Sequence, residues 1–587
     1  MFNFLTKGTL DNPPLHPIVT NMQNSQKNIT FLEINSSYSH TMLSYGYLRT
    51  FTEKMSPSWE WEHICATTND DPDKLLSNLA ASRPDVICGT FYLFNHEYSL
   101  DILKRYKEEN PQTRIFLGGP EFLGDNEMFL RRNPEISAVF RGDESSFSMV
   151  LSRISEHETW KDIPGICYIS SGKYNDNGFA KFAGNLDEIP SPYEKGYFSP
   201  DRPFCQIETS RGCSGRCSFC TSALSEGTRH FSLGRIRSEI ECLHKAGIRD
   251  IRIVDRTFNE DKSRAKALLG LFRKYSDTRF HLEINPALVD NELMRQLSMF
   301  KPGKLHIEAG IQTFCTRSLK AVNRFGSSAK MVSGLKRLVS LENAQVHTDL
   351  IAGLPLQKYQ DVLADVRKLI ALNPHEIQLE NLKILPGTPI CSNPPDGLLW
   401  NPLPPYEVIR TAQMKRSELS RAQNLSRMLD SFLNYAKLKN LFRFGYRRDK
   451  MFIVKFLEYL ERNSDPTQKQ HLDRRLLLIK EYADKNDPLL SELTVFFWLA
   501  CGFPPGKFDL VAEKIKPWTS EDKLPDKLIF SSQSDVIPSR IIKVLFSFNA
   551  GDIWLDSDAK FAKRKHVYFF YSAHGNRILQ ITQMPLS

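Results

Sequence analysis

Three cysteines in one short loop constrain this chain more than any other part of its sequence. They lie in the segment Cys213-Ser214-Gly215-Arg216-Cys217-Ser218-Phe219-Cys220, at spacings of four and three residues. Three thiolates can hold an iron–sulfur cubane and leave its fourth iron open, whereas a cluster closed by four protein ligands serves only electron transfer. With 11 cysteines in 587 residues, this spacing is expected by chance about 0.004 times per chain. The sequence therefore predicts an open 4Fe–4S cluster on Cys213, Cys217 and Cys220.

The residues before the loop agree with this interpretation. Residues 204–210 have the pattern of a short strand, which leads directly into the cysteines. Gly212 and Gly215 allow the backbone to bend tightly around a bulky cluster. Glu208 and Arg211 are spaced for an ordinary ion pair.

The alternatives to a cluster are a structural zinc site and unrelated buried cysteines. Zinc usually takes its remaining ligands from a second short-spaced Cys/His pair, and His230, Cys242 and His244 do not form one. The remaining cysteines have no short-spaced partners, so we expect them to be structural, as free cysteine usually is. They are Cys65, Cys88, Cys167, Cys205, Cys242, Cys315, Cys391 and Cys501.

Residues 28–158 alternate short apolar runs with amphipathic stretches, after an N-terminal arm at 1–27. Five such units predict a doubly wound, Rossmann-like parallel sheet, which binds ligands beyond the carboxyl ends of its strands. The expected strands are Ile29–Ile34, Trp59–Cys65, Val86–Thr90, Arg114–Leu117 and Ala138–Phe140, with helices at 41–54, 72–82, 96–109, 125–132 and 144–156.

The loops after four of these strands are small, polar or rich in glycine. Glycines at strand ends admit the close approach of a large ligand. Because the four loops share one edge of the predicted sheet, they indicate a binding surface. They are Asn35–His40, Thr90–Tyr92, Gly118–Glu121 and Arg141–Glu144.

A second series of alternating elements covers residues 201–395. A linker at 159–200 precedes it, in which Gly165–Ser170 and Phe179–Phe182 are expected to form a hairpin around Gly172–Asn175. Six βα repeats follow, and polar side chains end several strands, where α/β barrels carry their chemistry. The expected strands are 204–209, 250–255, 280–284, 304–309, 345–350 and 376–382.

The composition changes again after Pro394, and we expect residues 396–587 to form an α+β domain of unknown function. The pattern predicts helices within 405–500, with amphipathic runs at Glu407–Leu425, Met451–Leu460 and Leu489–Ala500. Residues 527–587 are β-rich. Aromatic side chains in the helical part are interpreted as core.

The cysteine spacing, with Phe219 before the last cysteine, resembles the signature of the radical S-adenosylmethionine (SAM) enzymes. The preceding α/β domain resembles the cobalamin-binding domain of one large subclass. The resemblance implies a partial (β/α)6 barrel, a 4Fe–4S cluster, SAM and cobalamin. The Asp-x-His-x-x-Gly motif of that domain is absent, and His40 has the wrong spacing. Cobalt is therefore bound without this histidine, or the domain has lost its cofactor.

The same resemblance suggests contact residues for the two organic cofactors. Phe219, Glu283 and Gln312 correspond to segments that hold SAM. For cobalamin, the strand-end loops offer Ser37, Thr90, Gly118, Gly119 and Gly142. No catalytic acid or base can be assigned from the sequence.

The implied reaction is reductive cleavage of SAM to a 5′-deoxyadenosyl radical, followed by methyl transfer to an unactivated carbon of an unknown substrate. One alternative is a cobalt-free radical SAM enzyme for rearrangement or oxidation. Methylthiolation would need further cluster cysteines, which Cys65 and Cys88 do not supply. A non-catalytic iron–sulfur protein for electron transfer or sensing is the alternative from another class.

The charge and hydropathy of the chain bear on its partners and location. The net charge is +9, and we interpret the basic clusters Arg443–Lys450 and Lys560–Lys565 as solvated surface. The alternative is contact with an anionic partner, either nucleic acid or acidic lipid headgroups. No nucleic-acid-binding motif accompanies the basic clusters. Neither a signal peptide nor an apolar stretch of about 20 residues is present, so we expect a cytoplasmic protein with reduced thiols. An electron donor such as flavodoxin or ferredoxin is the expected partner.

Overall fold

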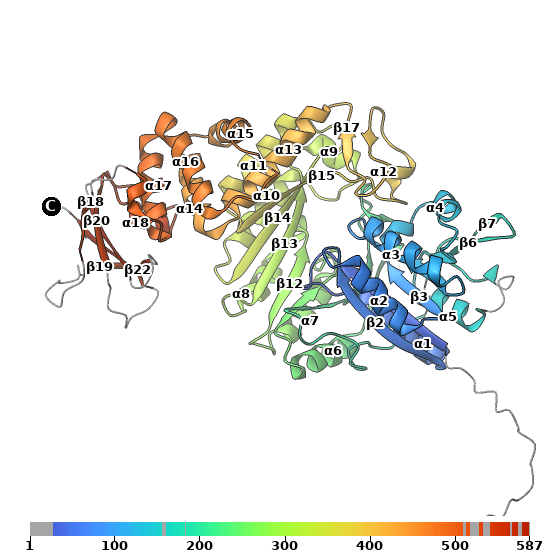
Figure 1. Ribbon diagram of the computed structural model, residues 1–587. Coiled ribbons are helices and arrows are strands. Elements are labelled where there is room, and N and C mark those ends of the chain that lie inside the picture. Colours follow the sequence, from blue (N-terminus) through green and yellow to red (C-terminus); the bar gives the residue numbers. More distant parts are fainter. Residues whose placement is uncertain are drawn as a thin grey trace, which may run out of the picture.

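The structure is a computed structural model that describes residues 27–154, 160–181, 184–465, 467–508, 512–516, 527–531, 540–563, 566–572 and 578–585. Three regions follow one another along these residues: an N-terminal α/β domain, a central half-barrel, and a helical region that ends in a small sheet (Figure 1). Residues 1–26 of the predicted arm lie outside the described residues, and Lys27 already begins the first strand.

The N-terminal domain is doubly wound, as predicted. Its parallel strands are β1 (Lys27–Asn35), β2 (Trp59–Thr67), β3 (Val86–Thr90), β4 (Arg114–Gly118) and β5 (Ala138–Phe140), in the order β2-β1-β3-β4-β5. The helices that cover them are α1 (Leu43–Met55), α2 (Pro72–Ser82), α3 (His96–Glu109), α4 (Glu127–Arg132) and α5 (Ser145–Ser152). Buried side chains of α1 and α5 pack on one face of the sheet, and those of α2 and α3 pack on the other.

A hairpin extends this sheet with two antiparallel strands, β6 (Ile166–Ser170) and β7 (Lys173–Asp176). The predicted second strand, Phe179–Phe182, is wrong, because residues 177–181 form no strand and residue 182 lies outside the described residues. The turn is tighter than expected: Ser171 and Gly172 both have positive φ, 48° and 75°, as in two-residue hairpin loops. The polar sequence of β7 suits an exposed edge strand but carries no apolar alternation.

The central region contains six parallel strands in the order β15-β14-β13-β12-β11-β8, which makes a partial barrel with β8 and β15 at its edges. The strands are β8 (Cys205–Ile207), β11 (Asp250–Ile253), β12 (Arg279–Ile284), β13 (Leu305–Gln312), β14 (Ala344–Ala352) and β15 (Glu376–Asn381). The surrounding helices are α6 (Leu233–Lys245), α7 (Lys262–Phe272), α8 (Asn291–Ser298), α9 (Thr316–Ala321), α10 (Ser328–Val339) and α11 (Tyr359–Leu372). Buried apolar residues alternate with half-buried polar ones along β12, β13 and β14.

The C-terminal region is α+β, as predicted. Its helices are α13 (Arg416–Met428), α14 (Ala436–Arg448), α15 (Phe452–Asn463), α16 (Leu472–Asn486) and α17 (Pro488–Ala500). The antiparallel sheet has the order β18-β20-β21-β22-β19, formed by β18 (Ala512–Lys516), β20 (Arg540–Phe546), β21 (His566–Ser572), β22 (Ile578–Pro585) and β19 (Lys527–Ser531).

Two further details concern the helices of the C-terminal region. The helix predicted from Glu407 begins only at Arg416, because β17 (Val408–Arg410) pairs with β16 (Leu399–Trp400) before it. A short helix, α18 (Ala550–Leu555), contacts α14 and α17. Among the described helices, none has the length and apolar character needed to cross a bilayer.

Candidate active site between the first domain and the half-barrel

An ion triad of mostly buried side chains, 14–22% exposed, joins the first domain to the half-barrel. The Arg211 guanidinium donates two hydrogen bonds, of 2.8 and 2.9 Å, to the Glu144 carboxylate, and one of 2.9 Å to Glu208. Glu144 follows β5, whereas Glu208 and Arg211 follow β8. Burial raises the pKa of Glu144, but the charge and hydrogen bonds of Arg211 outweigh it and hold that pKa below its usual value. The ends of β5 and β8 therefore face each other.

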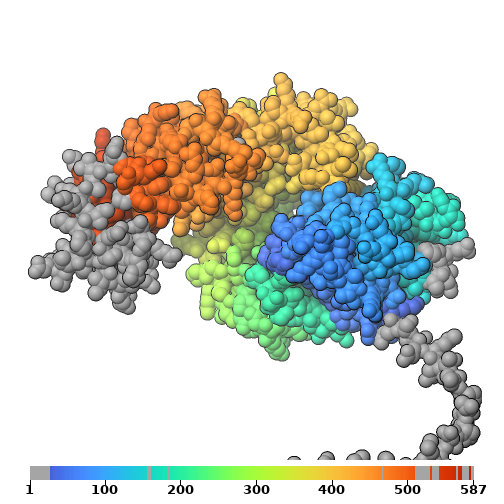
Figure 2. Space-filling model, viewed as in Figure 1, coloured from blue at the N-terminus to red at the C-terminus, as the bar shows by residue number. Residues whose placement is uncertain are grey.

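Other strand-end loops meet in the same way. Tyr406 donates a 2.6 Å hydrogen bond to buried Glu121, which follows β4. A Cβ on Gly387 would lie 2.3 Å from the carbonyl oxygen of Leu123, so the turn after the barrel strands packs directly on the first domain. In Figure 2 the first domain, blue to cyan, lies against the central region, green to yellow. The predicted ligand edge of the first domain is thus turned toward the half-barrel.

The cysteine loop closes a small antiparallel hairpin that the sequence did not predict. Cys213 ends β9 (Ser210–Cys213), which pairs with β10 (Gly227–His230). Within the loop, Ser218 N donates to Val322 O and Ser218 O accepts from Ile390 N, both at 2.9 Å. These bonds fix the loop to segments that follow α9 and β15.

Hydrogen-bond donors contact two of the three loop thiols. Gly215 N donates to Cys213 Sγ at 3.3 Å, and Arg324 Nη1 donates to Cys217 Sγ at 3.7 Å. Burial raises the pKa of Cys217, Arg324 lowers it, and the negative charge of Cys220 and Cys213 raises it further, so Cys217 lies within electrostatic range of both other sulfurs. Thiolates that accept N–H bonds are suited to an iron–sulfur cluster. The donor set therefore fits the predicted 4Fe–4S group.

Gly212 is required by the geometry of this hairpin. Its φ is +92°, and an added Cβ would lie 2.2 Å from the carbonyl oxygen of Gly227. Gly227 has a similar φ of +96°, but nothing lies within 4 Å of its added Cβ. This geometry is consistent with the predicted role of Gly212 in bending the backbone. Gly215, in contrast, does not have a positive φ.

The pair of glycines gives a matched test. We expect Gly212→Ala to prevent the hairpin from closing and to remove most of the iron that the chain retains after cluster reconstitution. Gly227→Ala should cost only the backbone strain, about 1–3 kcal/mol, and should leave iron retention near that of the wild type. Iron content and the urea midpoint of unfolding measure both. Equal iron loss in the two variants would contradict the steric explanation.

The two polar residues predicted for SAM lie near the cysteine loop. Thr257 Oγ1 is 3.7 Å from Cys213 Sγ, and Phe258 N donates to the carbonyl of Glu283 at 2.8 Å. Gln312 Nε2 would lie 2.9 Å from a Cβ on Gly310, whose carbonyl accepts from Arg324. The backbone of Glu283 thus connects to Cys213 through Phe258 and Thr257, and Gln312 connects to Cys217 through Gly310 and Arg324.

Both residues are in unusual environments. Burial and the neighbouring charge of Glu308 raise the pKa of Glu283 to about 7, although Arg256 opposes this. Gln312 has a φ of +67° at a β-bulge in β13, a strained conformation that recurs at functional sites. The third predicted residue, Phe219, is half-buried and packs against the barrel core.

The concave face of the half-barrel carries a cluster of histidines and acids that was not predicted from the sequence. His281 and His306 contact each other at 2.8 Å between their Nδ1 atoms, and His281 Nε2 lies 3.3 Å from Glu308. His347 Nε2 lies 3.1 Å from Asp349. Burial and His281 lower the pKa of His306 to about 3, whereas Asp349 overcomes burial and raises that of His347 to about 9. Single histidines 25 to 66 residues apart give no sequence motif.

The residues predicted for cobalamin lie on the edge that faces the half-barrel, with different local roles. The Thr90 hydroxyl is paired with Ser44 at 2.7 Å, and the Ser37 hydroxyl lies 2.9 Å from the Nδ1 atom of His40. Gly118 leaves space for a ligand, since the nearest atom to an added Cβ is 4.0 Å away.

Two of the predicted glycines are explained by the protein itself. Added Cβ atoms on Gly119 and Gly142 would lie 2.6 and 2.2 Å from the carbonyl oxygens of Phe91 and Ala180. Their backbones also have positive φ values, +106° and +132°, which favour glycine whether or not a ligand is bound. Of the three glycines predicted for cobalamin, Gly118 is therefore the one that leaves space for its direct approach.

Comparison with known proteins agrees with this architecture. Residues 207–369 match the family described as Radical SAM superfamily, and residues 47–151 match the B12 binding domain. The chain therefore carries a radical SAM region and a B12-binding region. The predicted cofactors, a 4Fe–4S cluster, SAM and cobalamin, are those of proteins in which these two regions occur together.

Similar proteins cover only part of this architecture. The chain is 25% identical over 395 residues to the cobalamin-dependent radical SAM methyltransferase TokK of Streptomyces tokunonensis, covering 62% of this chain and 56% of that protein. A 2-(S-pantetheinyl)-carbapenam-3-carboxylate methyltransferase of Streptantibioticus cattleyicolor is also 25% identical, over 394 residues and the same shares. The chain thus spans about half the length of these curated relatives.

A solved structure shares the fold over most of the chain. The cobalamin-dependent SAM radical enzyme OxsB, with aqua-cobalamin and SAM bound, superposes with a TM-score of 0.57 over 81% of this chain and 78% of that one, at 14% identity. This likeness concerns the fold alone.

Proposed function

We propose that this chain is a cobalamin-dependent radical SAM enzyme that cleaves SAM reductively to a 5′-deoxyadenosyl radical and transfers a methyl group to an unactivated carbon. The observation that carries this proposal is the position of the cysteine loop. It follows the first barrel strand and lies beside the Arg211–Glu144 contact, where the ligand edge of the B12-binding domain meets the half-barrel.

Cys213, Cys217 and Cys220 would hold the cluster, and Gly118 offers open space for cobalamin. When bound, the cluster supplies the electron that cleaves SAM, and cobalamin supplies the methyl group that is transferred. The protein orients the reactants and excludes water. Arg324 and the Gly215 amide stabilise thiolate sulfur by donating hydrogen bonds to it, and the triad at Arg211 keeps the two domains in register.

Glu283 and Gln312 are the proposed SAM contacts. The Glu283 carboxylate is suited to the cationic sulfonium and ammonium groups of SAM, because opposite charges attract strongly where solvent is partly excluded. The histidines and acids of the concave face, among them His347 and Asp349, would line the substrate space. This lining favours a substrate with polar, hydrogen-bonding groups near its reacting carbon.

The products of SAM test the reaction class. We expect anaerobic, reconstituted protein with a reductant, SAM and cobalamin to form both 5′-deoxyadenosine and S-adenosylhomocysteine, the products of radical formation and of methyl donation. Formation of 5′-deoxyadenosine alone, unchanged by cobalamin, would support the cobalt-free radical enzyme. If neither product forms, both the cobalamin-dependent and the cobalt-free proposals are contradicted. The missing Asp-x-His-x-x-Gly histidine keeps the cobalt-free reaction as the second candidate.

Glu283→Gln is expected to separate SAM binding from stability. The pKa of Glu283 in the folded chain, about 7, lies above its ordinary value, so its ionisation destabilises the fold progressively as pH rises toward 7. The amide removes this penalty, and the variant should be as stable as the wild type or more so at pH 8.

The same variant should bind SAM more weakly. Because a cationic ligand favours the carboxylate, wild-type affinity should fall as pH drops below 7, whereas the variant should show little such dependence. Calorimetric titration of SAM at pH 6 and 8 measures this, with Glu380→Gln on β15 as the control. A pH dependence that persists in Glu283→Gln would exclude Glu283 as the titrating contact.

A further inference from the structure

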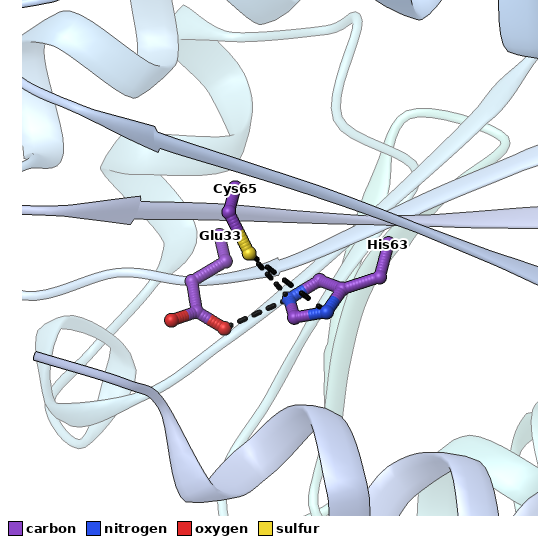
Figure 3. A group of neighbouring side chains, drawn as sticks. All are labelled: Glu33, His63 and Cys65. Atoms are coloured by element: carbon purple, nitrogen blue, oxygen red, sulfur yellow. Dashed lines mark hydrogen bonds and ion pairs between the residues drawn. The ribbon is translucent and has the colours of Figure 1, made fainter. Parts of the chain in front are cut away.

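Three potential metal ligands converge in the first domain, apart from the cysteine loop. Glu33 lies on β1, and His63 and Cys65 lie on the adjacent strand β2, where Cys65 is the direct partner of Glu33. His63 Nε2 is 2.9 Å from Glu33 Oε2 and 3.1 Å from Cys65 Sγ. Figure 3 shows the carboxylate and the sulfur both directed toward the imidazole ring. Among the described residues, this is the group whose carboxylate, imidazole and thiol donor atoms all lie within 4.8 Å of one another.

Hydrogen bonding alone satisfies this group poorly. A ring nitrogen carries either a hydrogen or an available lone pair, and cannot use both. If Nε2 donates to Glu33, the Cys65 S–H is left with the more distant Nδ1 at 3.8 Å; if Nε2 accepts from Cys65, the Glu33 oxygen at 2.9 Å has no donor there. A cation removes the conflict, because carboxylate, thiolate and imidazole lone pair can all bind it.

The surroundings hold two of the three groups in place. Glu33 is almost fully buried, and its other oxygen, Oε1, accepts from Asn35 Nδ2 at 2.6 Å and from Met42 N at 3.0 Å. The Tyr45 ring stacks on His63 with centroids 3.7 Å apart. Outer contacts of this kind orient metal ligands and tune their affinity.

We propose that Glu33, His63 and Cys65 bind a divalent ion of the zinc class. Zinc accepts mixed oxygen, nitrogen and sulfur ligands with bonds of about 2.0–2.3 Å, which places neighbouring ligands roughly 3.3–3.6 Å apart around a tetrahedral ion. The two separations from His63 Nε2, 2.9 and 3.1 Å, are slightly shorter, so a small outward movement admits the ion. One carboxylate and one thiolate cancel its two charges, as a buried site requires.

The cavity beside the group indicates a structural role. It measures about 30 Å³ and is lined by Glu33 and His63 together with Tyr197 and Gln206, which lie after the first domain. This volume admits one or two waters and is too small for a substrate. Water would complete the coordination. The ion would then join β1 to β2 where the first domain meets the entry to the half-barrel, independently of the proposed reaction.

Zinc content of the full-length protein with its iron sites filled tests the proposal, because the cysteine loop is then unavailable to zinc. After incubation with equimolar Zn²⁺ and removal of loose metal, we expect about one zinc per chain. His63→Ala and Cys65→Ser should lower retained zinc about tenfold or more. Cys242→Ser, which changes a half-buried thiol on α6, should retain it.

A second measurement does not depend on how the variants fold. Zinc-edge X-ray absorption of the wild-type protein should show one sulfur at about 2.3 Å and nitrogen or oxygen ligands at about 2.0–2.1 Å. The alternative is that Arg202, which lies beside Cys65, supplies the positive charge and no ion binds. Absence of retained zinc would establish that alternative, and zinc without a sulfur ligand would place the ion elsewhere; either result would overturn the proposed site.

Discussion

A Cys217→Ala chain is expected to lose its cluster and all detectable cleavage of SAM. Cys217 is the most buried of the three loop cysteines, and two remaining thiols cannot anchor a cubane with a single open iron. The yield of 5′-deoxyadenosine should fall by at least about a thousandfold, equivalent to roughly 4 kcal/mol of barrier. Iron content and 5′-deoxyadenosine formation, both measured anaerobically, report the effect.

Two outcomes separate this effect from general damage to the fold. Cys242→Ser should keep iron content and SAM cleavage near wild-type values, because Cys242 lies on the outer helix α6. Cys217→Ala should keep its far-ultraviolet circular dichroism, since the loop contributes little regular structure. A Cys217→Ala chain that still cleaves SAM would exclude the loop as the cluster site.

Arg211→Met is expected to cause the largest loss of stability among single changes at the domain contact. It leaves Glu144 and Glu208, whose side chains are only 14% and 22% exposed, without their shared cation. Removing one partner of a buried ion pair typically costs about 3–5 kcal/mol. Because Arg211 lies two residues before Cys213, iron retention should fall as well. Urea unfolding and iron content measure the two consequences.

The pH dependence of the Arg211→Met effect follows from Glu144. In the wild type its pKa is held below the usual value, so its stabilising contribution is present at neutral pH and is lost on acidification. In the variant the buried carboxylates favour protonation. The difference in stability between the two chains should therefore be largest near neutral pH and should shrink as the pH falls toward 4.

A surface pair provides the matched control. Arg153 pairs with Asp162 at 2.8 Å, with side chains 35% and 65% exposed, and Arg153→Met should cost less than about 1 kcal/mol. Adding Glu144→Gln to Arg211→Met should recover part of the lost stability, because one unpaired carboxylate disappears. Equal costs for Arg211→Met and Arg153→Met would refute a structural role for the triad.

The parallel strands were predictable because each is a short apolar run bounded by loop residues. The structure confirms the five strands of the first domain and the six of the half-barrel. Strands β7 and β9 were missed for one physical reason: they are short and polar and belong to hairpins. Their pairing depends on turn geometry, which apolar periodicity does not report.

The residues of the candidate site likewise fall into two kinds: those that a local motif reveals and those that only the fold brings together. The cysteines were predictable because their spacing is local. Arg324 and Cys217 are 107 residues apart, and Glu144 and Arg211 are 67 apart, so only the fold brings these pairs together. Gly119 and Gly142 are a related case, because both were predicted to contact cobalamin. Their conformations serve contacts with backbone carbonyls, and a glycine at a strand end is therefore weak support for a ligand.

The iron and cobalt content of protein produced and purified without oxygen, with cobalamin supplied, tests the central claim most directly. We predict about four irons per chain together with near-stoichiometric cobalt. Four irons without cobalt would contradict the methyl-transfer proposal and leave the cobalt-free radical reaction. Zinc on the cysteine loop in place of iron would contradict the whole account.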